Sequence, residues 1–318
     1  MQTELMPETS DWLLAPAAPV VHEAPNAASA PTLATGSPSP EVASALFGGL
    51  FDDGVGREVA KKAMAENEAK QRAAIEAARA QLGDRLEIGG AGPNGVSEEE
   101  YERMVDLHAK IALGQTDIQF DAGGMKRDKA AQLKELAMND MATMMQTQAG
   151  RELLGEMACN TDNESGEHHK TTIQFMRDVK DAHCTRPASE ELGWDIENRD
   201  HDGRGNDAIV QYAPGQGFVA AGTDGYEVAH RSDTILFHEM VHAYHRTHGT
   251  LAQGEVNPLS PNDIGLGNVE YQATGLGDHS LDRFTENDYR QERIDLGEEL
   301  ALRERYKTID GEFNHHDE

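Results

Sequence analysis

The stretch from Ser232 to His248 constrains the fold most strongly, because it must form a buried helix that also carries ionisable side chains. Its apolar residues, among them Ile235–Phe237, surround two histidines that stand four positions apart, His238 and His242. Residues four apart lie one above the other on the same helix face. Imidazoles on a buried helix need partners that compensate for their lost hydration. The sequence therefore predicts a helix over residues 232–248 whose polar side chains meet a metal ion.

His238, Glu239 and His242 form the pattern H-E-x-x-H. At this spacing both imidazoles can reach one Zn²⁺ ion at about 2.0–2.1 Å. Glu239 would sit beside the metal, where it can take a proton from water and pass it to a leaving amine. With this composition the pattern arises by chance in roughly one such sequence in sixteen, and the apolar surroundings make coincidence rarer. We therefore predict metal ligands at His238 and His242 and a general base at Glu239.

A catalytic zinc site takes a third protein ligand and leaves the fourth position for water. His248 has the spacing of the metzincin pattern, but that pattern requires glycine where this chain has His245, and a later methionine, whereas the last methionine here is Met240. On a continuing helix, His248 would also face away from the metal. Glu270, which lies 28 residues after His242, would complete a His₂Glu set like that of thermolysin. Glu270 is therefore the favoured third ligand, with His248 as the alternative.

Three segments of the chain resemble the NleD-like effector zinc metalloproteases, which type III secretion systems of animal and plant pathogens inject into host cells. These segments are Leu236–Tyr244, Glu270–Gly277 and Thr285–Asn287. The resemblance covers roughly residues 140–300. The spacing from Glu270 to Gly275 is also similar to the third-ligand segment of clostridial neurotoxin light chains. Family members often carry two acidic residues where this chain has Val269 before Glu270, so one carboxylate is missing while the expected ligand is present.

The resemblance implies a secreted virulence effector that acts as a zinc endopeptidase on host proteins in the host cytoplasm. The best-known family members cleave stress-activated MAP kinases in the activation loop, so these kinases are candidate substrates. Substrate choice depends on surface loops and transfers less readily than the chemistry. The competing hypothesis is a non-catalytic acidic adaptor with a structural zinc site, but no Cys or His stands where it could close such a site as a fourth ligand. If the site is catalytic, Tyr289 or Arg290 could reach the oxyanion of the tetrahedral intermediate, although a structural role is favoured for both residues.

Composition separates the N-terminal region from the rest of the chain. Residues 1–56 contain seven of the twelve prolines, and no Lys or Arg precedes Arg57. Such a segment cannot bury enough apolar surface to offset its ordering entropy, and it lacks the basic residues of a Sec-type signal. We expect a disordered leader, which is either a linker or a secretion signal. The family resemblance favours the secretion signal.

The charge and cysteine content narrow the range of partners. The chain carries 28 Lys and Arg against 57 Asp and Glu, for a net charge of −29. This excess of acid repels phosphate backbones and anionic lipid, so we expect neither nucleic acid nor a membrane as partner. Two cysteines cannot build a disulfide framework. A host protein as the partner is what the family resemblance implies.

Periodicity and turn residues predict the remaining elements. Helices are predicted over residues 57–82, 97–113, 128–148, 232–248 and 286–306, and strands over 171–175 and 208–212. The zinc helix is expected to start at Ser232 and Asp233 and to stop at Gly249. The fold class is thus α+β, a helix-rich zincin-like metallopeptidase domain with a small sheet. We expect a disordered leader over residues 1–56, a helical N-terminal region over 57–125 and the metallopeptidase domain over 126–318.

Overall fold

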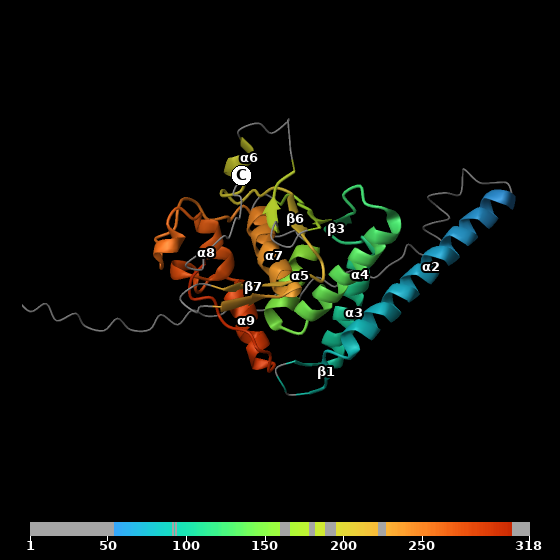
Figure 1. The fold of residues 1–318 in the computed structure, drawn as a ribbon. Helices are drawn as coiled ribbons and strands as arrows, with labels where there is room; N and C mark the ends of the chain where they lie inside the picture. The colour runs from blue at the N-terminus through green and yellow to red at the C-terminus, as the bar shows by residue number, and fades with distance from the viewer. Residues whose placement is uncertain are drawn as a thin grey trace, which may run out of the picture. The chain divides into compact units, whose positions relative to one another are not determined.

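Helix α7 (Ser232–His248) lies at the centre of the fold, beside a four-stranded sheet and helix α5 (Gln148–Ala158) (Figure 1). The computed structural model describes residues 54–90, 92, 94–159, 166–177, 182–187, 195–221 and 227–306. Nearly all of the predicted leader, residues 1–53, lies outside the described residues. Residues 63–318 form one compact unit. The predicted helix over 232–248 is confirmed, and Gly249 ends it in the left-handed conformation with φ 67°.

The central sheet has the strand order β3-β4-β6-β5. Its strands are β3 (Ile118–Asp121), β4 (Thr171–Phe175), β5 (His183–Thr185) and β6 (Ala208–Tyr212). The first three in this order run parallel, and β5 pairs antiparallel with β6. Strands β4 and β6 confirm the two predicted strands, and both alternate buried and half-buried residues, as a strand with one core face should. Strand β5 occupies an edge of the sheet, so one side of its backbone faces no other described strand.

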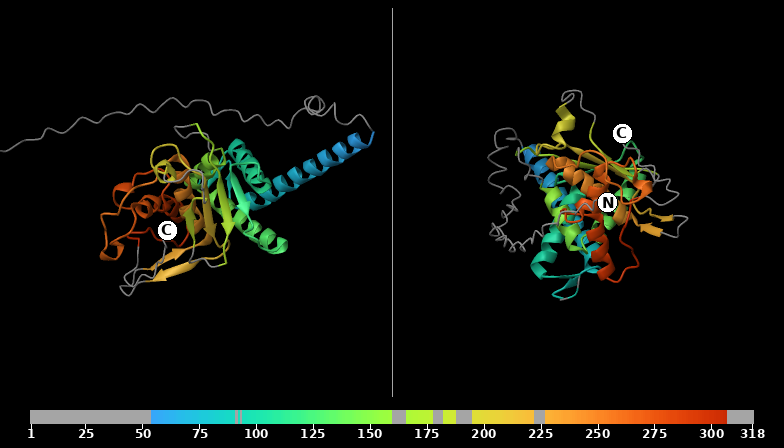
Figure 2. Two further views of the ribbon diagram at one scale, coloured as in Figure 1. Left: turned by 90° about the horizontal axis from the view of Figure 1, so that it is seen from above. Right: turned by 90° about the vertical axis from the view of Figure 1, so that its left-hand side faces the viewer.

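Two further strand pairs stand outside the central sheet. Strands β1 (Glu87–Ile88) and β2 (Gly95–Val96) form a short parallel pair. Strands β7 (Phe218–Ala221) and β8 (Glu227–His230) pair antiparallel, and Figure 2 shows them as a separate ribbon of two strands. A single residue, Arg231, separates the end of β8 from the start of α7.

The sequence prediction of a single helix over residues 128–148 is wrong. Helix α4 (Arg127–Met144) ends earlier, and α5 starts at Gln148. Thr147 caps α5, because its hydroxyl accepts a hydrogen bond from the Gly150 amide at 3.0 Å. Gly150, in the first turn of α5, permits a close approach of the two helices, since an added Cβ would lie 2.1 Å from the Met144 carbonyl oxygen.

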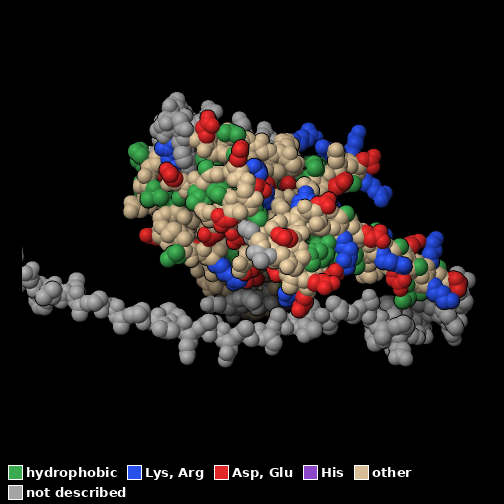
Figure 3. Space-filling model, turned by 90° about the horizontal axis from the view of Figure 1, so that it is seen from below, with side chains coloured by type: hydrophobic (Ala, Val, Ile, Leu, Met, Phe, Trp, Pro, Cys, Tyr) green, Lys and Arg blue, Asp and Glu red, His purple; other side chains and the backbone are tan. Residues whose placement is uncertain are grey.

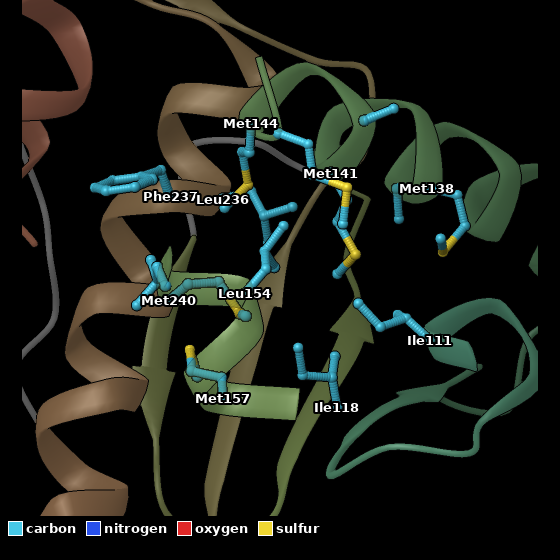
Figure 4. Packing of buried hydrophobic residues seen from close by; sticks show 14 of the residues in the cluster. Ile111, Ile118, Met138, Met141, Met144, Leu154, Met157, Leu236, Phe237 and Met240 are labelled. Carbon is cyan, nitrogen blue, oxygen red and sulfur yellow. The ribbon is translucent and has the colours of Figure 1, made fainter. Parts of the chain in front are cut away.

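Methionine fills much of the core between α4, α5 and α7. Figure 4 shows Met141 and Met144 of α4 pointing toward Leu154 of α5 and Leu236 of α7, with Met138 farther along α4, and all five are buried. Flexible thioether chains pack well into irregular spaces between helices. These methionines therefore belong to the hydrophobic core and not to a metal-ligand set.

The N-terminal helices follow their sequence patterns. Helix α2 (Gly54–Gly83) confirms the helix predicted over residues 57–82, and Ala78 and Leu82 near its end are buried in the core. Helix α3 (Glu98–Leu113) begins after Ser97, whose hydroxyl accepts from the Glu100 amide at 3.1 Å. Acidic and basic side chains alternate over the face in Figure 3. Of the helices that the structure describes, none is long and apolar enough to cross a membrane.

The C-terminal part departs from its prediction. Helix α8 (Asn268–Thr274) follows a loop, and α9 (Glu286–Asp295) is much shorter than the expected helix over residues 286–306. Gly297 has a φ of 89°, which a right-handed helix does not accommodate, and residues 298–306, the last that the structure describes, form no helix. The remaining short helices are α6 (Asp195–Arg199), η2 (Pro261–Asp263) and η3 (Gly277–His279). The fold is helix-rich α+β with small sheets, so the predicted fold class is confirmed, while the proposed three-part division of the chain stays a prediction.

Candidate active site

Helix α7 is anchored at its start by contacts to two other helices. The Ser232 hydroxyl donates to the buried Asp140 of α4 at 2.5 Å, and the Tyr289 hydroxyl of α9 donates to Asp233 at 2.5 Å. Ser232 and Asp233 do mark the start of the helix, as predicted, but neither caps it, since Arg231 holds the capping position. These side chains thus fix α7 against α4 and α9 instead of satisfying its free amides.

His238, His242 and Glu270 converge on one point, and all three are buried. The Nε2 atoms of the two histidines lie 3.1 Å apart. An Oε2 atom of Glu270 lies 3.2 Å from the His238 Nε2 and 3.4 Å from the His242 Nε2. Glu270 arrives on α8, which packs against α7. The structure therefore brings together the three residues that the sequence predicted as metal ligands.

The donor atoms fit a tetrahedral metal ion. Ligand atoms at about 2.0–2.1 Å from zinc lie about 3.3 Å apart along the edges of a tetrahedron, and the three distances here are 3.1, 3.2 and 3.4 Å. Burial lowers the pKa of His238, but Glu270 and Glu286 outweigh it and raise that pKa to about 10. The surroundings of His238 thus favour a positive charge, which a divalent cation supplies.

Glu239 lies next to these three residues and is 2% exposed. It follows His238 on α7, and it lines a cavity of about 500 Å³ together with His242 and Glu270. Its Oε2 atom has no hydrogen-bond partner among the described residues. A buried carboxylate oxygen without a protein partner needs a water molecule or a substrate group to satisfy it. Glu239 is therefore placed to act on a molecule in the cavity.

The cavity, which we call the cleft, runs along the edge strand β5. All three β5 residues line it, opposite the segment around Gln253 and the start of α8. Cys184 is poorly suited to act as a nucleophile, because burial raises the pKa of its thiol to about 12 and so disfavours the reactive thiolate. The lining residues are His183, Cys184, Thr185, Arg186, Glu197, Asp200, His201, Glu239, His242, Arg246, Leu251, Ala252, Gln253, Gly254, Gly267, Val269 and Glu270.

A carboxylate behind the site orients one of the histidines. The His238 Nδ1 lies 2.9 Å from Glu286, so that its N–H can donate while Nε2 faces the cluster. Arg290 donates to Glu286 at 2.6 Å, and Arg303 donates to it at 2.8 Å. Burial raises the pKa of Glu286, but the two arginines outweigh burial and hold that pKa well below its ordinary value. Glu286 is therefore a permanent anion that fixes the His238 ring.

The alternative residues weighed in the sequence lie elsewhere. His248 directs its Nδ1 to the Tyr244 carbonyl oxygen at 2.7 Å, and it is not part of the metal-ligand group. Tyr289 stacks on Phe237 with ring centroids 4.4 Å apart. Neither Tyr289 nor Arg290 lines the cleft. Both α9 residues support the structure around α7, in line with the structural role favoured for them.

Sequence reasoning missed three residues beside this site, namely Glu286, Arg303 and Tyr306. Tyr306 is 2% exposed, and its ring centroid lies 6.2 Å from that of His238. Arg303 and Tyr306 were missed because residues 286–306 were predicted to form one helix, and a continuous helix would place both residues far from Glu286. Gly297 was the available signal, since glycine past a charged helix is a common stop.

The fold and the cluster together define a zincin-like α+β protein with an H-E-x-x-H helix. Residues 121–306 match the Peptidase M91 family, described as effector protein. The match spans more than half of the chain, so the chain belongs to this peptidase family of effector proteins, and the predicted NleD-like membership is confirmed. No curated protein sequence matches the chain.

Among solved structures, the chain is similar to the light chain of botulinum neurotoxin serotype HA. The TM-score is 0.35 and the sequence identity is 13%, over 54% of this chain. The chain covers 51% of that light chain, or about half its length.

Proposed function

We propose that this effector is a zinc endopeptidase that cleaves host proteins. The observation that carries this assignment is the convergence of His238, His242 and Glu270 within tetrahedral spacing, with the unpaired Glu239 carboxylate oxygen beside them. Membership of a peptidase family supports the same reaction class. His238, His242 and Glu270 would hold the metal, and Glu239 would act as general acid and base.

A zinc ion in this position polarises the scissile carbonyl and lowers the pKa of water toward neutrality. Glu239 would accept a proton from the attacking water and then deliver it to the leaving amine, because its side chain lines the cleft next to the predicted ligands His242 and Glu270. His238 keeps its Nε2 directed at the site because Glu286 accepts its Nδ1 proton. His238, Glu239 and Glu270 are buried, so the electrostatic interactions between them are stronger than they would be in bulk water.

The cleft supports a polypeptide substrate. Strand β5 lines the cleft, and among the described strands it pairs with β6 alone, so its other side is an edge of the sheet. An extended chain can pair with such an edge through main-chain hydrogen bonds, while its alternate side chains enter neighbouring pockets. Pairing along β5 would place the substrate backbone beside Glu239. Stress-activated MAP kinases are candidate substrates through the family resemblance, as are other host proteins with an extended exposed loop.

The competing function is an acidic adaptor with a structural zinc site. A structural site is closed by four protein ligands, whereas the His-His-Glu group has three members among the described residues. The neighbouring Glu239 lines the cleft and has one carboxylate oxygen without a hydrogen-bond partner among the described residues. Both features favour a catalytic site.

We also propose that delivery of this effector into the host cell depends on the leader over residues 1–56.

Incubation of the purified protein with host lysate tests this function. New protein N-termini are mapped with and without a zinc chelator, and Glu239→Gln serves as the control for contaminating proteases. We expect termini that appear with the wild-type protein and vanish with the chelator and with the variant. Termini that persist with Glu239→Gln, or none with the zinc-loaded protein, would contradict the assignment.

A further inference from the structure

Two arginines line the cleft beyond the metal-ligand group, and we call them the arginine pair. Arg186 directly follows strand β5, and Arg246 lies on α7 four residues after His242. Both donate to the same oxygen, the Oδ2 of Asp200, and the distance from Arg186 is 3.0 Å. Asp200 is 2% exposed and also accepts a hydrogen bond from the Asn206 side-chain amide at 2.5 Å. One buried carboxylate therefore holds both guanidiniums in place.

Arg186 has donors left for a further anion. A guanidinium carries five N–H groups, and among the described residues those of Arg186 reach only Asp200 and Glu197, the latter at 3.3 Å. The Glu197 side chain is 75% exposed, whereas that of Arg186 is 29% exposed. Solvent screens an ion pair with so exposed a partner, so the pair contributes little. An anion in the cleft can therefore replace Glu197 at Arg186 and leave the buried contact with Asp200 intact.

Positive charge is in excess in this part of the cleft. The two guanidiniums share one buried carboxylate, and the Nε atom of Arg246 is buried without a hydrogen-bond partner among the described residues. Of the described lining residues outside the metal site, Glu197 is the one other carboxylate. Since Glu197 is mostly solvent-exposed, the arginine pair favours an additional negative charge from a molecule in the cleft.

The arginine pair lies a short way along the cleft from the metal-ligand group. Four residues of α7 separate His242 from Arg246, which corresponds to a rise of about 6 Å. An extended peptide advances about 3.3 Å per residue. A peptide paired with β5 would reach Arg186 at the end of that strand, because Arg186 follows Thr185, its last residue. The arginine pair is thus about two peptide residues away from the scissile bond.

We propose that Arg186 is a specificity-determining residue that selects substrates with an aspartate or glutamate about two residues from the scissile bond. A guanidinium binds a carboxylate through two parallel N–H···O hydrogen bonds. Because Asp200 already holds Arg186, binding costs little further ordering of the side chain. The opposite choice, a basic residue beside Glu197, lacks such support, since Glu197 is held by no buried group among the described residues. The inference rests on the proposed endopeptidase function.

The test is the cleavage preference of the zinc-loaded full chain on a library of peptides prepared from a host proteome. Mapping of the new termini gives the frequency of each residue type at each position around the cleaved bonds. We expect Asp and Glu to be enriched at one position about two residues from the bond. The enrichment should disappear in Arg186→Gln. Glu197→Gln removes the competing carboxylate and should preserve or increase the enrichment.

Kinetics on one cleaved peptide give the magnitude. A hydrogen bond to a charged group corresponds to about a 10–100-fold effect, so Arg186→Gln should lower kcat/KM for the acidic peptide by that factor. The same peptide with the acid replaced by its amide should be cleaved equally by the variant and the wild type. A merely structural role of Arg186 would lower the rate for both peptides.

Arg204→Gln is the matched control. The Arg204 side chain is 36% exposed, similar to that of Arg186, and it pairs with Asp202, but it does not line the cleft. This variant should keep the wild-type preference, and thermal melts verify that every variant folds. Wild-type cleavage without an acidic preference, a preference for Lys or Arg at that position, or equal losses for both peptides in Arg186→Gln would overturn the proposal. Absence of any cleavage by the zinc-loaded wild type would instead contradict the endopeptidase function on which the proposal rests.

Discussion

Glu286 is the residue whose replacement should reveal most about how the site is held. It is 1% exposed. Its carboxylate forms ion pairs with Arg290 and Arg303 and also orients the His238 ring. Glu286→Gln preserves the shape of the side chain but leaves one oxygen for three donors. At least one N–H of these three partners must then face the amide NH₂ group.

The expected cost follows from the burial of the pair. Removal of one partner from a buried ion pair destabilises a protein by about 3–5 kcal/mol. For a domain of this size, 1 kcal/mol shifts the melting temperature by about 2–4 °C, so Glu286→Gln should lower it by roughly 6–20 °C. Thermal melts are recorded in chelator, because bound metal would add its own stabilisation.

Glu102→Gln is the control for loss of an ion pair as such. Glu102 pairs with Arg79 at the surface, where both side chains are about half exposed, at 48% and 47%. Solvent screens such surface pairs, so their contribution to stability is small, and this variant should melt within a few degrees of the wild type. A melting temperature for Glu286→Gln that matches that of Glu102→Gln would refute the reasoning.

Three further predictions test the chemistry and the fold. Glu239→Gln should lower the rate of cleavage by roughly 10²–10⁴-fold with zinc content unchanged, measured by kinetics and metal analysis; an active variant would exclude Glu239 as the base. Glu270→Ala should lose most of its zinc and His248→Ala should retain it, measured as zinc stoichiometry, and the reverse result would restore His248 as third ligand. Burial raises the pKa of Asp140 to about 6 from 3.8, so the folded state binds the extra proton between about pH 4 and 6 and stability falls as pH rises through that range. Asp140→Asn should remove up to about 3 kcal/mol of this pH dependence in denaturant titrations, and an unchanged pH profile would contradict the shift.

Local rules were sufficient where a signal acts within one helical turn. The helix over residues 232–248 follows from its apolar residues and from Gly249, and its geometry alone puts His238 and His242 on one face. The same geometry turns His248 away from the pair. Strands β4 and β6 were equally readable, because both alternate buried and half-buried residues along their length.

Local rules failed where two local signals compete. The sequence over residues 128–158 is helical in composition throughout, and the cap at Thr147 decided the break between α4 and α5. Beyond Asp295 the charged residues favour a helix, but Gly297 and the contact of Arg303 with Glu286 favour the non-helical conformation that residues 298–306 adopt. The first break is thus decided by a local cap that competes with helical composition, whereas beyond Asp295 the long-range contact of Arg303 with Glu286 adds to the local signal of Gly297.

The sequence by itself determined which residues can bind metal on α7 and the helix that spaces them, because helix periodicity is a property of the backbone. Only the tertiary structure decided which carboxylate joins them and which groups orient them. Glu270 reaches His238 across 32 positions of sequence, and Glu286 reaches it across 48. Such contacts depend on how α8 and α9 pack against α7, and a buried side chain takes its orientation from the neighbours that satisfy it.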